Sequence, residues 1–265
     1  MAATRLDYVR GFAVLSGAVA QVAFGALPFI LGWENTVGSR SNELVSLLTP
    51  ASYAFSIWSV IFAGCGLFAL YHLARPSHPS LRRIGWFAAL VFWGNALWEI
   101  WVPFYGFDIF AMGLILLIWA IMVSGLSSAV RDREAGLADR VIRAPLFLLG
   151  GWLNAAAFVS LLITANAVSF PWVGSGAAEP ALVILAIAVI AALDVIWRTR
   201  SLSYAAAISW GLYAIHIGNT QRGDPLVAQA ALGAIGLAGL VLLASWVFNR
   251  PKRELDKAAA ASGTA

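Results

Sequence analysis

Residues 107–128 read FDIFAMGLILLIWAIMVSGLSS, and this stretch determines the class of fold. Asp108 is its only charged residue. An α-helix needs about 20 predominantly apolar residues to cross the hydrocarbon core of a bilayer, so the stretch is long enough. It lacks the strict alternation of a barrel strand, and a single segment in lipid satisfies its own backbone hydrogen bonds only as a helix. The stretch therefore predicts a membrane-spanning helix.

The rest of the chain has the same character. Hydrophobic residues make up 61% of the 265 residues and charged residues only 11%, against roughly 25% charged residues in a soluble domain. This composition excludes a soluble enzyme, a disordered protein and a disulfide-stapled secreted module. We predict an all-α polytopic membrane protein with about eight transmembrane helices. The seven other apolar segments are at about 11–32, 54–74, 85–103, 144–168, 180–197, 203–218 and 225–248.

Basic residues are distributed unevenly between the two sides that these segments define. Fifteen of the 17 Lys and Arg residues fall on one side, and only Arg40 and Arg222 fall on the other. Cytoplasmic loops carry such an excess, which predicts cytoplasmic N- and C-termini. The short loops suit a bacterial cytoplasmic (inner) membrane, and the net charge of +4 reflects topology rather than nucleic-acid binding. Residues 249–265 are predicted to form a disordered cytoplasmic tail.

No catalytic signature occurs in the chain, and the sequence has no His or Cys cluster with metal-ligand spacing. Ionisable residues within the membrane are therefore the next candidates, because they are costly there. Helical spacing places Asn95, Trp98, Glu99 and Val102 on one stripe. The stripe would present an aromatic wall, an amide and a carboxylate together. The alternative is that Glu99 lies near the outer interface and contacts water.

Tryptophan is the second unusual feature, with 12 residues in the chain. Tryptophans at segment ends are typical interface anchors. Those deeper in the segments either line a cavity for a flat apolar ligand or face lipid and core. These deeper tryptophans are Trp58, Trp93, Trp98, Trp119, Trp152 and Trp210. With the polar residues of the outer leaflet, they predict an outward-opening pocket with aromatic walls.

Two motifs carry a family resemblance. Residues 49–58, TPASYAFSIW, and the run from Asn95 and Trp98 to the Pro-Phe-Tyr-Gly of residues 103–106 resemble the TspO/MBR family of tryptophan-rich sensory proteins. The family has five helices with a long first loop, and residues 1–168 show that layout. Tyr53 stands where the family often has Trp, and two extra residues separate Trp98 from Pro103. Three further helices at 169–248 would make this chain an extended member.

The resemblance implies a pocket within the five-helix bundle, covered by the first outer loop. One wall would be formed by Pro50, Tyr53, Phe55 and Trp58. Asn95 and Trp98 would face it, and the stripe analysis adds Glu99. Family members bind tetrapyrroles such as porphyrin, and some bind sterols. They are often dimers, so a homodimer or a larger membrane complex is expected here.

The leading functional prediction is a membrane sensor or receptor for a flat hydrophobic molecule, either a tetrapyrrole or a sterol-like compound. A transporter of such molecules is one alternative. A structural subunit of a membrane complex is another. Enzymatic photo-oxidation of porphyrin is a further alternative that the resemblance allows. No metal is predicted, and porphyrin enters only as a ligand.

Overall fold

A computed structural model of the chain describes residues 2–130, 137–173 and 178–248. Every regular element in those ranges is helical, which confirms the prediction of an all-α membrane protein. The predicted tail at 249–265 lies outside the described residues. The helices are α1 (Arg5–Ile30), α2 (Val37–Glu43), the 3-10 turn η1 (Ser52–Ser56), α3 (Ile57–Ala74), α4 (Pro79–Tyr105), α5 (Ile109–Val130), α6 (Leu137–Ala167), α7 (Ala178–Thr199), α8 (Leu202–Arg222) and α9 (Pro225–Phe248).

Seven of the described helices are long and apolar enough to cross a membrane. They are α1, η1 with α3, α4, α5, α6, α7 and α9. The eighth predicted segment, 203–218, lies within α8, which is 21 residues long but too polar to be counted with them. Its polar side chains Tyr204 and Asn219 are fully buried against neighbouring helices. Protein contacts therefore cover polar groups that lipid would not tolerate.

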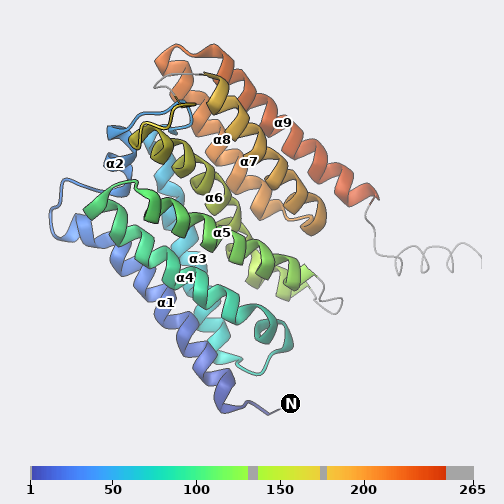
Figure 1. Cartoon of the computed structure of the whole chain (residues 1–265). Helices are drawn as coiled ribbons and strands as arrows, with labels where there is room; N and C mark the ends of the chain where they lie inside the picture. Colours follow the sequence, from blue (N-terminus) through green and yellow to red (C-terminus); the bar gives the residue numbers. More distant parts are fainter. Residues whose placement is uncertain (1, 131–136, 174–177, 249–265) are drawn as a thin grey trace, which may run out of the picture.

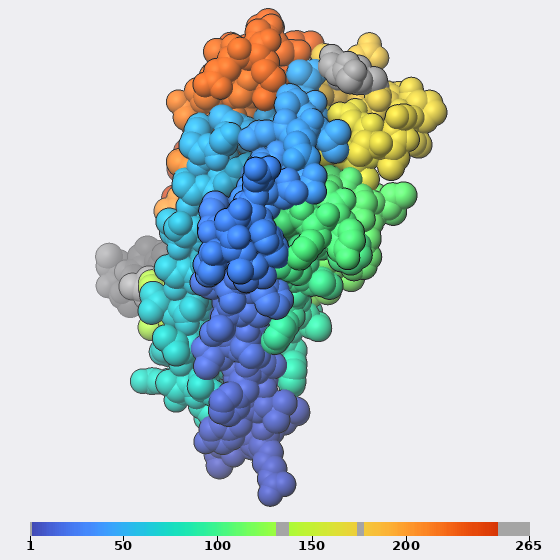
Figure 2. Space-filling view, turned by 90° about the vertical axis from the view of Figure 1, so that its left-hand side faces the viewer, coloured from blue at the N-terminus to red at the C-terminus, as the bar shows by residue number. Residues whose placement is uncertain are grey.

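Helix α6 lies at the centre of the molecule. It packs against α3 and α5 on one side and against α7 and α8 on the other. The α1, α3 and α4 helices form the N-terminal part, and α9 covers α7 and α8 (Figure 1). Between α1 and α3, the chain lies across the upper half of the face in view and reaches the orange C-terminal helices at the top (Figure 2). A central α6 explains why it is the most buried of the spanning helices.

The long helices begin and end at residues with clear local reasons. Asp108 accepts a hydrogen bond from the backbone N–H of Ala111 (2.7 Å) before α5, and Asp224 accepts one from Val227 (3.0 Å) at the start of α9. Such caps satisfy N–H groups that the first turn leaves without partners. Gly223 ends α8 with a φ of +78°, a left-handed conformation that glycine adopts without strain.

A buried ionic network joins α1, α3 and α4 at the end where the chain begins. The Arg10 guanidinium donates hydrogen bonds to the Asp7 carboxylate (2.9 Å), to the Pro76 carbonyl (2.6 Å) and to the His72 ring (3.1 Å). Arg82 of α4 pairs with the same Asp7 carboxylate. Asp7 and Arg10 are each only 3% exposed. Pairing makes this burial of charge tolerable and fixes the spacing of three helix ends.

Candidate ligand pocket

A pocket lies where α4, α6 and α8 meet the segment between α1 and α3, and its empty space is about 420 Å³ including its open mouth. The lining comes from α2, η1, α4, α6, α8 and the loops beside them. The lining residues are Val37, Ser41, Pro50, Phe55, Trp98, Phe107, Trp152, Ala155, Ala156, Val159, Ser160, Gly211 and Ile215.

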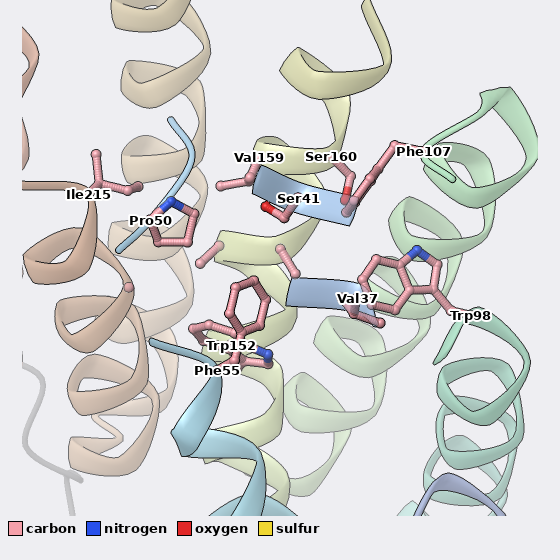
Figure 3. Close-up of a pocket in the computed structure, with 13 residues that line it drawn as sticks. Val37, Ser41, Pro50, Phe55, Trp98, Phe107, Trp152, Val159, Ser160 and Ile215 are labelled. Carbon is pink, nitrogen blue, oxygen red and sulfur yellow. The ribbon is translucent and has the colours of Figure 1, made fainter. Parts of the chain in front are cut away.

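Four of the thirteen lining residues are aromatic. Trp98 and Phe107 lie at one end, Pro50 and Ile215 at the other, and Phe55 and Trp152 lie between them (Figure 3). The Trp98 and Phe107 rings meet edge to face with centroids 6.0 Å apart. Phe55 and Trp152 do the same at 6.3 Å. Edge-to-face contacts hold aromatic rings in place, so the cavity has firm walls.

Polar groups are few in this lining. Ser41 and Ser160 supply the only side-chain hydroxyls, and no charged residue is among the lining residues. The indole N–H groups of Trp98 and Trp152 are buried and have no hydrogen-bond partner within the described ranges. A buried donor without a partner is costly. The site could therefore hold a flat uncharged molecule that brings one or two acceptor atoms.

The structure brings together three of the seven residues predicted for the site. Pro50, Phe55 and Trp98 all line the cavity. Trp58 lies just behind the lining, edge to face with Trp152 at 5.9 Å. Tyr53 is 40% exposed and packs on the Trp210 ring instead, with centroids 5.3 Å apart.

Asn95 and Glu99 do not line the cavity. The Asn95 amide donates hydrogen bonds to Glu99 Oε1 (3.0 Å) and to Gln21 Oε1 of α1 (3.4 Å). The predicted common stripe therefore divides, because successive helix residues are separated by about 100° and α4 is covered on several sides. Trp98 points to the cavity, and Asn95 and Glu99 point to α1.

Sequence reasoning missed the contribution of α6 and α8. Trp152 was recognised as a deep tryptophan, but its neighbours Ala155, Ala156 and Gly211 carried no signal. Small residues leave the space that the cavity occupies, yet they are equally common at tight helix contacts. The described ranges also hold no group of three His, Cys, Asp or Glu side chains that could bind a metal ion.

The segment that covers the pocket, residues 44–56, is held on α8 by hydrogen bonds. Side chains of α8 donate these bonds to backbone carbonyls of the segment. Asn219 donates to the Leu47 carbonyl (2.7 Å), and Arg222 donates to the Thr49 carbonyl (2.9 Å). The Trp210 indole donates to the Ala54 carbonyl (2.9 Å). The α8 helix therefore lines the pocket and also holds its cover.

Comparison with known proteins agrees with this architecture. The family model for TSPO-like proteins matches residues 11–244. The chain belongs to the TSPO-like family. The match includes α7, α8 and α9, so the TSPO-like region extends well beyond the first five spanning helices. No curated protein and no solved structure matches this TSPO-like chain.

Proposed function

We propose that this TSPO-like protein is a membrane receptor or sensor that binds a flat, uncharged, mainly apolar molecule in the aromatic pocket. The observation that carries the proposal is an apolar pocket whose lining includes the aromatic rings of Phe55, Trp98, Phe107 and Trp152. Its lining offers apolar area for binding and two indole donors for orientation. Membership of the family supports a membrane protein of TspO type.

The chemistry of the lining selects between the two ligand classes that the resemblance implies. A free porphyrin carries carboxylates, and burying a charge without a partner is strongly unfavourable. The lining holds no cationic side chain, and Arg222 already donates to the Thr49 carbonyl. We therefore propose a sterol-like compound or another uncharged ring system, and we place a free tetrapyrrole acid second.

Binding measurements on the purified protein in detergent test this proposal. The probes are protoporphyrin and its dimethyl ester, followed by quenching of tryptophan fluorescence, and cholesterol, followed by its competition with the ester. The ester has the ring of the acid without its charges, so tighter binding of the ester isolates the effect of charge. We expect the affinity of the protein for the ester or the sterol to be at least about tenfold higher than its affinity for the acid.

A matched pair of variants locates the site. Trp98→Leu removes a ring that lines the cavity, whereas Trp93→Leu removes a 47%-exposed ring of the same helix. We expect Trp98→Leu to weaken binding about tenfold and Trp93→Leu to leave it unchanged. Equal affinities in the two variants would contradict the pocket, and preference for the free acid would contradict the ligand class.

We also propose that both termini face the cytoplasm of a bacterial inner membrane. The long helices alternate in direction, so the beginnings of α1, α4 and α6 lie at one end of the molecule (Figure 1). That end carries Arg10, Arg82 and Arg143, and the opposite end carries Arg40 and Arg222. This asymmetry supports the orientation through the positive-inside rule.

A further inference from the structure

Gln21 of α1 and Asn95 and Glu99 of α4 form a polar cluster inside the membrane-spanning part of the molecule. Asn95 Nδ2 lies 3.0 Å from Glu99 Oε1 and 3.4 Å from Gln21 Oε1. The side chains are almost completely covered, with exposures of 0% for Gln21, 0% for Asn95 and 3% for Glu99. None of the three lines the aromatic pocket, so the cluster is a separate feature.

Each member of the cluster has one buried polar atom without a hydrogen-bond partner within the described residues. These atoms are Gln21 Nε2, Asn95 Oδ1 and Glu99 Oε2. Buried polar groups in proteins are nearly always hydrogen-bonded, so three unused atoms in one cluster require an explanation. Gln21 offers a spare donor, and Asn95 offers a spare acceptor. The second carboxyl oxygen of Glu99 can donate a hydrogen bond when it is protonated and accept one when it is ionised.

The groups that surround Glu99 carry no compensating charge. On α1, a Cβ added at Gly25 would lie 3.0 Å from Glu99 Oε2. The same Cβ would lie 3.3 Å from the Phe62 ring of α3, and the Cys65 thiol lies within hydrogen-bonding reach of Gln21.

The charged groups nearest along the packed helices are already engaged elsewhere. Arg40 of α2 bonds the Pro103 carbonyl, one turn beyond Glu99, and pairs with Glu43 at 3.0 Å. Arg10 lies 11 residues before Gln21, about 16 Å along α1, and pairs with Asp7. Within the described ranges, Glu99 makes no ion pair. An ionised carboxylate there would be held only by amides.

We infer that Gln21, Asn95 and Glu99 form a proton-binding site inside the membrane, in which the Glu99 carboxyl takes up and releases the proton. The spare acceptor of Asn95 suits the acid form, whose O–H must donate a hydrogen bond. The spare donor of Gln21 suits the carboxylate, which accepts only. Rotation of the Gln21 and Asn95 amides would therefore provide a hydrogen-bond partner for the acid and for the carboxylate of Glu99. A core residue that stays neutral would need a partner for the acid alone.

Infrared spectroscopy of the purified protein tests this inference without any ligand for the aromatic pocket. The C=O stretching band of a carboxylic acid is separate from that of a carboxylate and shifts in heavy water. We expect an acid band from the Glu99 carboxyl at acidic pH. The band should disappear reversibly at alkaline pH. It should be absent in Glu99→Gln and retained in Glu34→Gln, which removes an exposed loop carboxyl.

A second variant keeps the test informative if Glu99→Gln does not fold. Asn95→Leu removes the donor to Glu99 Oε1, so the acid form should persist to higher pH than in the natural chain. A missing Glu99-dependent acid band would overturn the inference, and so would a band that never titrates. Loss of the band on adding sodium at constant pH would also overturn it, since the site would then hold a metal cation. Each result is independent of the aromatic pocket.

Discussion

At the scale of single residues, Asp7 is the carboxylate on which the buried ionic network depends. Its carboxylate pairs with Arg10 of its own helix and with Arg82 of α4, and it also accepts from the Thr4 cap. Arg10 in turn reaches the Pro76 carbonyl beyond α3. One carboxylate therefore organises both cations of the network. Removing one partner from a buried pair costs more than the pair itself contributes, because the other charge is left uncompensated.

We expect Asp7→Asn to lower the melting temperature by several degrees, because Arg10 remains buried without its counter-charge. Thermal unfolding of the detergent-solubilised protein, followed by circular dichroism, measures the change. The matched control is Asp194→Asn. It breaks the Asp194–Arg198 pair, whose side chains are 57% and 46% exposed. Such surface pairs contribute little, so the control should melt within about a degree of the natural chain. Equal losses in both variants would contradict the role of the buried network.

The residues of α4 show how far sequence reasoning reached toward the site. The sequence predicts one site for Pro50, Phe55 and Trp98, and all three residues line the same pocket. Glu99 was assigned to that site as well, but it lies toward α1. Hydrophobic periodicity indicates which face of a helix is buried only when the opposite face is polar. In α4, apolar and polar residues are buried on several sides, so the direction of each side chain depends on its partner helices.

At the scale of elements, α8 makes side-chain hydrogen bonds to other elements near both of its ends. Tyr204 donates to Asn154 of α6 (3.3 Å), and Asn154 donates to the Ala188 carbonyl of α7 (3.1 Å). At the other end, Asn219 and Arg222 hold the carbonyls of the pocket cover. These bonds explain why α8 is less apolar than a helix that faces lipid.

We predict that Asn219→Leu loosens the cover of the pocket while leaving the helices in place. The change keeps the size of the side chain but removes the donor to the Leu47 carbonyl. Backbone amides of residues 44–56 should then exchange with deuterium about fivefold faster, as expected for the loss of roughly 1 kcal/mol from local closure. Mass spectrometry of peptic fragments locates the change.

Thr220→Val provides the comparison for this measurement. The Thr220 hydroxyl donates only to the His216 carbonyl of its own helix. Exchange of residues 44–56 should therefore match that of the natural chain. Faster exchange spread over all helices of Asn219→Leu would indicate global destabilisation and would contradict a specific fastening of the cover.

The ends of a helix can be predicted from the sequence where the change from apolar to polar residues alone determines them. The segment 225–248 coincides with α9, and 180–197 lies within α7. The sequence predicts a loop where the short helix α2 lies, because the residues VGSRSNE show no apolar periodicity. It forms because Thr36 caps it and because Arg40 bonds the Pro103 carbonyl. Such tertiary contacts are not visible in a local pattern.

At the scale of the whole molecule, the close contact of α6 with α8 joins the N-terminal helices to the C-terminal ones. Gly151 of α6 makes this contact: a Cβ there would lie 2.5 Å from the Tyr204 carbonyl oxygen and 2.9 Å from the Ala207 side chain. Backbone cannot move aside as a flexible side chain can, so the two helices would have to separate. The pocket lies along the same pair of helices and would change shape with them.

We expect Gly151→Ala to destabilise the protein by about 1–3 kcal/mol through this overpacking. Gly233→Ala is the matched control in another long helix, because a Cβ there meets nothing within 4 Å. Alanine is the better helix former, so the control should be neutral or slightly stabilising. Thermal unfolding in detergent compares the two. If Gly151→Ala melted as Gly233→Ala does, the close contact of α6 with α8 would be contradicted.

Cys65 has a practical consequence for later experiments. It is the only cysteine of the chain, and it is 0% exposed within α3. Maleimide reagents in water should therefore leave the folded natural chain unmodified, and no cysteine-free background needs to be engineered. A single cysteine placed in the cover segment or in the turn before α4 can then carry a spin label or a fluorophore. Labelling of intact cells would report the sidedness of each loop, and paired labels would report distances across the bundle.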